Sequence, residues 1–456
     1  MTTARFTWIA TALALIIATT PARAQTTSPS AEISQEGRTT FRLHAPEATD
    51  VRVTGNWPGG GPVAMTKDAG GVWSATVGPL TPELWSYRFI VNGVPTVDPQ
   101  NNNVIRDGLR VDNLLLVPGA ESALYQNRDV PHGTLGATWY DSPSLKLKRR
   151  MFVYTPPGYE TSSARFPVLY LLHGYGGRQD TFTTRLASLA ESQDRLAAAQ
   201  GFSEFIVVTP SAYTLHKGSM YSVSPTIGDW ERFIAEDLVA YMDSHYRTLA
   251  NRMSRGLAGH SMGGYGALRI GMKRPDVFLS LYLMSSCCLS ANRNPRPDGM
   301  AASEAIKTRE QAVEAAAAPG FGPSTSLASA AAWSANPANP PLFLDLPVKD
   351  GKVRPDIVAK WVANAPLEMV EQHTEALNRY YAIAVEVGLQ DPLLGANQQL
   401  HAALTRLHVP HYYEEYEGDH TNKVRERIER NVLPFFSKNL ASPVNPTSPL
   451  PEGTAR

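Results

Sequence analysis

The sequence predicts two folded domains, a small all-β sandwich followed by a larger α/β domain with a mostly parallel sheet. The chain has 456 residues, which is more than one ordinary domain holds. Before residue 118, short segments alternate between apolar and polar residues, a pattern typical of the strands of a sandwich. After residue 138, continuously apolar segments alternate with helical patterns, as in a parallel sheet that is covered on both faces.

Residues 1–24 have the pattern of a signal peptide. Arg5 precedes an apolar stretch at 8–18, and the A-x-A sequence 22–24 follows it. The stretch is shorter than the roughly 20 residues that a membrane-spanning helix needs. We therefore expect a mature chain that starts at Gln25, carries no membrane anchor and is secreted or periplasmic.

The sandwich is predicted over residues 35–118. Alternating segments lie at 40–45, 51–55 and 85–94, and the last contains Asn92-Gly93, a pair that favours a tight hairpin turn. These segments lie between Gly and Pro clusters and lack a helical period. The sequence therefore predicts antiparallel strands with an immunoglobulin-like arrangement.

The tryptophans of the sandwich have two expected roles. Trp85, Tyr87 and Phe89 alternate along one strand and point to one side, so we expect them in the core. Trp57 lies in a Gly/Pro loop, so we expect an exposed ring.

Residues 119–137 are predicted to be a linker, and the α/β domain is predicted over 138–437. Its expected strands lie at 167–174, 205–210, 381–388 and 411–417, and its expected helices at 229–246 and 421–436. Between about 286 and 380 the alternation gives way to Ala-rich helical segments and Pro/Gly-rich loops. So long an insertion predicts a cap over the edge of the sheet. Residues 438–456 are Pro-rich and are expected to be disordered.

Charge and cysteine content exclude several classes of function. Lys plus Arg number 42 and Asp plus Glu number 42, so the net charge indicates neither nucleic acid nor an acidic membrane as partner. Cys287 and Cys288 are the only cysteines, and we expect two buried thiols because neighbouring cysteines bridge only through a strained ring. The sequence contains neither C-x-x-C nor a paired-histidine helix motif, so no metal and no cofactor is expected.

The sequence at 259–263, Gly-His-Ser-Met-Gly, fits the G-x-S-x-G motif. An expected strand precedes it and an expected helix follows it, as the motif requires. Only glycines at the flanking positions let a strand reverse into a helix so closely, and the turn leaves the serine hydroxyl at the carboxyl edge of the sheet. We therefore interpret Ser261 as a nucleophile.

A serine nucleophile needs a base and an orienting carboxylate, which in this fold follow in the order Ser, Asp or Glu, His. Asp391 lies in the loop after the strand at 381–388, whereas Glu386 lies within that strand. Of the histidines that follow Asp391, only His420 lies in a strand-to-helix loop at the same edge; the others are His401, His408 and His411. We therefore predict Asp391 as acid and His420 as base, and a surface histidine that caps a helix is the alternative for His420.

The oxyanion of the reaction needs backbone N–H groups. We assign those of Met262, which follows the nucleophile, and Tyr175, in the glycine-rich loop "LLHGYGG". His173 and His260 precede the reactive position, so we expect structural roles for both.

With these residues assigned, the chain resembles the esterase family of α/β-hydrolases that includes feruloyl esterases, acetylxylan esterases, esterase D, enterochelin esterases and mycolyltransferases. The resemblance covers roughly residues 130–437. It depends on "RRMFVYTPPGY", "FPVLYLLHGYGG", "EDLVAYMDSHYR", "RGLAGHSMGGYGALR", "GLQD" and "EGDH". It implies an α/β-hydrolase fold, and the nucleophile, acid and base of the family fall on Ser261, Asp391 and His420.

The front domain resembles the early-set, isoamylase N-terminal type of carbohydrate-binding module through "FRLHAPEATDVRVTGNW" and "YRFIVNGVPTVDPQN". This resemblance implies that the domain could bind glycan, with the Trp57 ring stacked on a sugar. The pairing is similar to bacterial feruloyl or acetylxylan esterases that act on plant hemicellulose. It implies a cofactor-independent serine carboxylesterase for a small or polysaccharide-linked ester. An enterochelin-type siderophore esterase, an acyltransferase and a glycan-binding protein with an inactive hydrolase domain are the alternatives.

Overall fold

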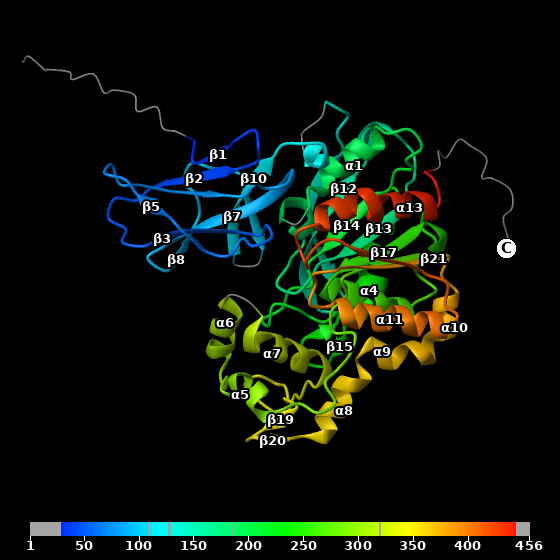
Figure 1. Ribbon diagram of the computed structural model, residues 1–456. Coiled ribbons are helices and arrows are strands. Elements are labelled where there is room, and N and C mark those ends of the chain that lie inside the picture. The colour runs from blue at the N-terminus through cyan, green and yellow to red at the C-terminus, as the bar shows by residue number, and fades with distance from the viewer. Residues whose placement is uncertain (1–28, 108–109, 126–128, 186, 319–320, 444–456) are drawn as a thin grey trace, which may run out of the picture.

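The computed structural model describes residues 29–443, except 108–109, 126–128, 186 and 319–320. The predicted signal peptide and all but the first six residues of the predicted tail lie outside the described residues. The front domain and the α/β domain are distinct bodies that lie side by side, and the cap extends from the α/β domain (Figure 1).

The front domain is built from two antiparallel sheets that share one apolar core. The first sheet has the order β1 (Ala31–Ile33), β2 (Thr39–His44), β6 (Val72–Val77), β5 (Thr66–Lys67). The second has the order β4 (Val63–Ala64), β3 (Val51–Gly55), β7 (Glu83–Val91), β10 (Arg110–Val117), β9 (Val104–Asp107), and β8 (Val94–Thr96) pairs with β7. Trp85, Tyr87 and Phe89 are buried in the core, as expected.

The hairpin between β7 and β8 turns at Asn92-Gly93. Both residues have positive φ, 47° and 81°, and Val91 pairs with Val94 across the turn. Two consecutive positive φ values match the right-handed twist of the strands, which is why Asn and Gly suit this turn. The hairpin predicted from the sequence is confirmed.

The prediction of an exposed Trp57 was wrong, because its side chain is only 6% exposed. The loop after β3 folds back on itself, since the Gly55 amide donates to the Gly60 carbonyl at 2.9 Å. This turn stacks the Trp57 ring on Phe41, with the ring centroids 5.8 Å apart. Gly55 leaves room for it, because a Cβ there would lie 2.0 Å from the ring. The Gly/Pro-rich composition of the loop gave no indication of this packing.

The α/β domain is organised around an eight-stranded mixed sheet. Its order is β11 (Thr134–Ser142), β12 (Leu147–Thr155), β14 (Ile206–Pro210), β13 (Val168–Leu172), β17 (Arg255–His260), β18 (Ser280–Met284), β21 (Ala382–Gly388), β22 (Tyr412–Tyr416). The strands from β14 to β22 are parallel, and β12 is antiparallel to both of its neighbours. The fold class predicted from the sequence is confirmed.

Strand β11 begins at Thr134, within the segment predicted to be a linker. The chain is already held to the α/β domain at Gly133, whose amide donates to Asp194 at 2.8 Å, and Tyr154 donates to the same carboxylate at 2.6 Å. β11 is an edge strand whose residues are mostly exposed. It therefore lacks the continuous apolar pattern that marks the inner strands. The short helix η1 (Glu121–Tyr125) precedes it.

Helices cover both faces of this sheet (Figure 1). One face carries a helical stretch made of α2 (Trp230–Arg232), η4 (Phe233–Leu238) and α3 (Val239–His245), together with α4 (Met262–Lys273) and α11 (Leu394–Arg406). The other carries α1 (Leu189–Ala197) and the stretch of α12 (Val424–Arg427), η7 (Ile428–Val432) and α13 (Leu433–Asn439). Shorter elements are η2 (Tyr159–Thr161), η3 (Thr181–Arg185), η5 (Arg252–Ser254) and the hairpin of β15 (Val223–Ser224) with β16 (Gly228–Asp229).

The cap lies between β18 and β21, where the sequence predicts an insertion. It contains α5 (Pro297–Glu304), α6 (Arg309–Ala317), α7 (Gly322–Trp333), β19 (Val348–Lys349), β20 (Lys352–Val353), α8 (Pro355–Ala363), α9 (Pro366–Met369), η6 (Val370–His373) and α10 (Thr374–Asn378). It has a small core of its own around Leu327 and Leu344. The Tyr265 hydroxyl on α4 donates to the Asn364 carbonyl at 2.9 Å, which ties the cap to the α/β domain. Among the described residues, none of the helices has the length and apolar character to cross a bilayer.

Candidate active site

Ser261 lies on a strained turn between β17 and α4. Its φ of 58° and ψ of −116° are unfavourable for a residue with a side chain. A Cβ at Gly259 would lie 2.2 Å from the backbone of Gly263, and one at Gly263 would lie 2.0 Å from the Leu172 carbonyl oxygen. Both glycines are therefore required by close backbone contacts. The turn places the Ser261 hydroxyl at the carboxyl edge of the sheet.

The structure brings Ser261, His420 and Asp391 into one chain of contacts. His420 Nε2 lies 2.9 Å from Ser261 Oγ, and His420 Nδ1 lies 2.8 Å from Asp391 Oδ2. With Nδ1–H donating to the carboxylate, Nε2 is free to accept the serine proton. The three side chains follow the carboxyl ends of β17, β21 and β22, strands that are parallel and therefore end at one edge.

The Asp391 carboxylate is held in its ionised form. Burial raises the pKa of this carboxyl, but the hydrogen bond and charge of His420 and the amide of Leu393 outweigh burial, so the pKa is lowered. The Leu393 amide donates to Oδ1 at 2.8 Å, which leaves Oδ2 for His420. The carboxylate therefore orients the imidazole and favours one tautomer.

The loop that carries His420 is fixed by its own polar residues. Asp419 Oδ1 accepts from the amides of Thr421 and Asn422 at 2.7 and 2.8 Å. Gln390, next to Asp391, accepts from the Gly418 amide at 2.8 Å, so the loops of the acid and the base hold each other.

His260, for which the sequence predicted only a structural role, contacts the loop of the proposed base. Its Nε2 donates to the His420 carbonyl oxygen at 2.8 Å, and the two rings lie 4.7 Å apart. Burial, with the nearby charge of His420, lowers the pKa of His260 to about 3. A neutral imidazole therefore supports the backbone of the proposed base. His173 also has a structural place, since its Nε2 accepts from the Ala212 amide at 2.8 Å.

Stability should depend on pH through His260. Its pKa is lowered to about 3 in the folded protein, against about 6.5 in an unfolded chain, so the unfolded state binds more protons between these values. Stability should therefore fall as the pH decreases through this window, by about 1.4 kcal/mol per pH unit from this residue. We therefore expect the free energy of unfolding of His260→Gln, measured by urea denaturation, to fall less steeply than that of wild type between pH 7 and 4.5. Parallel curves for the two proteins would contradict this.

A pocket of about 320 Å³ opens beside Ser261 and His420. Tyr175 and Met262, predicted as oxyanion donors, both line it. Met262 is the first residue of α4, where a backbone N–H has no partner within the helix. The other lining residues are largely apolar: Met220, Cys287, Cys288, Phe321, Thr325, Ser329, Pro392 and Leu393. Thr325 and Ser329 belong to α7, so the cap supplies part of the wall.

The structure resembles known proteins in both of its domains. A sequence profile for the family described as "Putative esterase" matches residues 142–424, which is more than half of the chain. The chain belongs to this esterase family. Membership confirms the resemblance and the fold class predicted from the sequence. A second profile, carbohydrate-binding module 48 (isoamylase N-terminal domain), matches residues 28–107 of the esterase.

Curated relatives match parts of the esterase. An endo-1,4-beta-xylanase/feruloyl esterase of Xylanibacter ruminicola is 30% identical over 254 residues, which are 54% of this chain and 34% of the relative. An esterase of Mycobacterium tuberculosis is 37% identical over 132 residues, 28% of this chain and 27% of the relative. The esterase thus spans about a third or less of the length of these relatives.

Solved structures show the same fold. A ferulic acid esterase is 22% identical, with 68% of this chain and 99% of that chain covered and a TM-score of 0.50. The enterobactin esterase of Shigella flexneri, solved with enterobactin, is 16% identical, with 90% and 96% covered and a TM-score of 0.57. The second likeness extends over both domains of the esterase, and at these identities it concerns the fold alone.

The other candidates for the acid and the base, one carboxylate and three histidines, lie elsewhere in the fold. Glu386 is buried within β21, where it accepts from Arg427 and from the Tyr282 hydroxyl, each at 2.6 Å. His401 and His411 contact each other, with Nδ1 and Nε2 2.8 Å apart. His408 follows α11 in a left-handed conformation, with φ of 54°.

The two cysteines are free thiols in the pocket wall of the esterase. Their sulfur atoms lie 2.7 Å apart, and both side chains are half-buried rather than fully buried as expected. The difference follows from their place after β18, at the carboxyl edge of the sheet, where the loop borders the pocket.

Within the described ranges, no group of three His, Cys, Asp or Glu side chains is arranged to hold a metal ion.

Proposed function

We propose that this esterase is a serine carboxylesterase whose nucleophile, base and acid are Ser261, His420 and Asp391. The observation that carries the proposal is the contact chain from the Ser261 hydroxyl through the His420 imidazole to the Asp391 carboxylate. Distances of 2.8 and 2.9 Å lie within the range that proton transfer requires.

Hydrolysis proceeds in two steps. Ser261 Oγ bonds to the ester carbonyl carbon while its proton moves to His420 Nε2, and His420 then gives this proton to the departing alcohol. Water then attacks the acyl-enzyme with His420 again accepting a proton, and the acid product leaves as Ser261 regains its hydrogen. Asp391 holds the imidazole in place and stabilises the imidazolium that forms in each step.

The negative charge on the substrate oxygen is stabilised by the backbone N–H groups of Tyr175 and Met262. The Met262 amide lies at the N-terminus of α4, whose dipole also favours negative charge. In comparable sites one such donor contributes about 3 kcal/mol of transition-state stabilisation.

We propose an aromatic acyl group of the feruloyl type rather than an acetyl group. The pocket beside Ser261 has about 320 Å³ and is bounded by Met, Cys, Phe, Pro and Leu side chains. Such a lining favours an apolar, flat group, and its size lies at the lower end of the range for small-molecule sites. The matched relative named a feruloyl esterase agrees with this choice.

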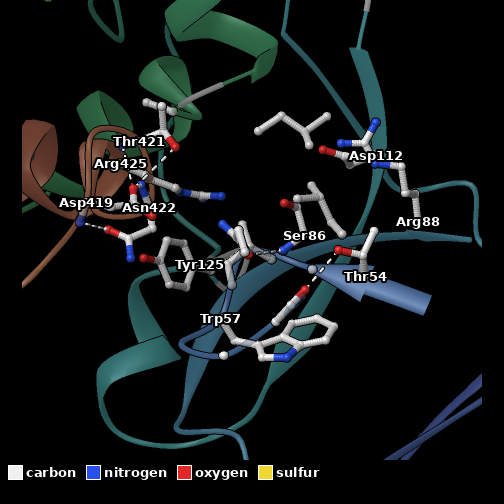
Figure 2. Close-up of a pocket in the computed structure, with 18 of the residues that line it drawn as sticks. Thr54, Trp57, Ser86, Arg88, Asp112, Tyr125, Asp419, Thr421, Asn422 and Arg425 are labelled. Carbon is white, nitrogen blue, oxygen red and sulfur yellow. Dashed lines mark hydrogen bonds and ion pairs between the residues drawn. The ribbon is translucent and has the colours of Figure 1, made fainter. Parts of the chain in front are cut away.

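We propose that the alcohol of the ester is a sugar of plant hemicellulose. A cleft of about 850 Å³ lies between the two domains and is lined by polar side chains from both, including Ser86, Arg88, Asn422 and Arg425 (Figure 2). Thr421, beside His420, lines this cleft and also a small pocket next to Ser261. The proposed path of the alcohol runs from the small pocket past Thr421 to this cleft. Secretion or a periplasmic location, proposed from the apolar segment 8–18, suits such a polymeric substrate.

A hydrolysis panel tests the proposed substrate class. Methyl ferulate, p-nitrophenyl acetate, feruloylated arabinoxylan, acetylated xylan and a catecholate trilactone would be compared by kcat/KM. We expect the feruloyl esters to be the best substrates of the set. Preference for the trilactone would instead assign a siderophore esterase, and hydrolysis of none of them would leave glycan binding as the function.

The shape of the acyl pocket gives a more local prediction. Ser329→Phe fills the pocket from α7, so kcat/KM for methyl ferulate should fall roughly 10-fold or more while that for p-nitrophenyl acetate changes little. Ser326→Phe places the same ring on α7 at a position that does not line this pocket and serves as the control. Equal losses for both substrates in Ser329→Phe would contradict the assignment of the pocket.

A further inference from the structure

The loop that carries His420 contacts the front domain as well as the α/β domain. On the α/β side it is held by the Gln390–Gly418 and His260–His420 hydrogen bonds. On the other side, three residues after His420, Lys423 forms an ion pair with Glu83, the first residue of β7. The loop of His420, the proposed base, is therefore attached to the α/β domain on one side and to the front domain on the other.

The burial of Glu83 indicates a structural ion pair rather than a surface contact. It is 2% exposed, although it is a carboxylate at the boundary of two domains. A buried carboxylate is costly unless it is paired, so loss of its partner would leave an uncompensated buried charge. Its Oε2 pairs with Lys423 and its Oε1 accepts from the Leu84 amide at 2.9 Å, so both oxygens are used.

A second contact reinforces the same junction. The guanidinium of Arg425 lies over the ring of Tyr125, 4.6 Å from its centroid. Tyr125 belongs to η1, which follows the front domain. Figure 2 shows Tyr125 beside Arg425, Asn422 and Asp419. The two contacts bring the segment from Asp419 to Arg425 against the front domain.

Apart from its own hydrogen bonds and the contacts with the two domains, the loop buries little of its surface. Between residues 418 and 424 only Gly418 and Val424 are buried. Segments with few buried apolar contacts open readily, so polar anchors decide where they lie. Proton transfer requires Nε2 to stay within about 2.6–3.2 Å of the serine oxygen, and a displacement of about 1 Å can lower the rate up to about 100-fold.

We propose that Glu83 of the front domain is a positioning residue for catalysis, which holds the His420 loop in register with Ser261 through its ion pair with Lys423. The inference rests on the proposed role of His420 and goes beyond glycan binding, because it makes the front domain part of the catalytic apparatus. It therefore requires the front domain to affect the hydrolysis of esters that contain no sugar.

The test is Glu83→Gln in the full chain, assayed with methyl ferulate and p-nitrophenyl acetate. Glutamine keeps the size and one carbonyl oxygen but loses the charge. The concentration of active sites is first measured by complete titration with a fluorophosphonate, so that kcat refers to folded sites only. We expect kcat per site to fall roughly 10-fold or more on both esters, with little change in KM.

Two further variants make the result specific. Asp50→Asn removes a carboxylate that pairs with Arg52 on the surface of the same domain, and it should leave kcat unchanged. Lys423→Met should resemble Glu83→Gln, and the double variant should lose no more than the worse single one, because both changes remove the same interaction.

Wild-type kcat per site in Glu83→Gln would overturn the inference, as would multiplicative losses in the double variant. A loss on feruloylated arabinoxylan alone would also overturn it and would leave the front domain with a binding role only. None of these outcomes affects the proposed function, which fails separately if Ser261 is dispensable.

Discussion

Ser261→Ala is expected to lower kcat for methyl ferulate by about 10⁶-fold, to the level left by binding and the oxyanion donors alone. The loss is this large because the hydroxyl 2.9 Å from His420 Nε2 is the proposed attacking group. The fold should survive, since one oxygen atom is removed from a side chain that is 6% exposed. Steady-state kinetics and thermal denaturation of the same preparation measure both effects.

Ser286→Ala is the matched control for this loss. Ser286 is a buried serine near the site, in the loop after β18, and its amide donates to Asn397 rather than to a member of the proposed triad. We expect kcat within a few-fold of wild type. A Ser261→Ala enzyme that retained a substantial fraction of wild-type kcat would remove Ser261 from the mechanism.

Asp391→Asn should lower kcat by about 10⁴-fold with little effect on KM. The amide cannot stabilise an imidazolium, and its NH₂ group favours the tautomer in which Nδ1 accepts, so Nε2 carries a hydrogen and cannot take the serine proton. The comparison of kcat and KM on methyl ferulate across pH 5–9 measures this. The loss should persist at every pH, because the tautomer rather than the total charge is altered.

Glu386→Gln tests which of two carboxylates, Glu386 or Asp391, is the acid of the proposed triad. Glu386 is 1% exposed and pairs with Arg427, so we expect about 3–5 kcal/mol of lost stability in urea denaturation and kcat per folded enzyme within a few-fold of wild type. The opposite result, a catalytic loss from Glu386→Gln and none from Asp391→Asn, would exchange the roles assigned to the two residues.

Much of the fold and the positions of the proposed triad could be predicted because both follow from local patterns. Parallel strands end at one edge, so loops after successive strands meet there, and the chain order selected Asp391 and His420. The turn at Ser261 was predictable because only glycines fit beside it. These arguments require no knowledge of packing.

The parts that could not be predicted depend on contacts between distant or irregular segments. Trp57 lies in a loop of polar composition, yet it packs on Phe41 because the loop folds back. Nothing in the periodicity around His260 indicates that its ring supports the His420 carbonyl. Glu83 and Lys423 are 340 positions apart, and no local pattern predicts that a carboxylate from one domain would pair with the loop of another.

Peptide mapping by mass spectrometry after reaction with a fluorophosphonate tests the central claim most directly. We expect a single adduct of one reagent per chain on the peptide that contains Ser261, formed at a much lower rate in His420→Ala and lost in Ser261→Ala. An adduct on a different residue, or unchanged labelling of the Ser261→Ala enzyme, would contradict the account.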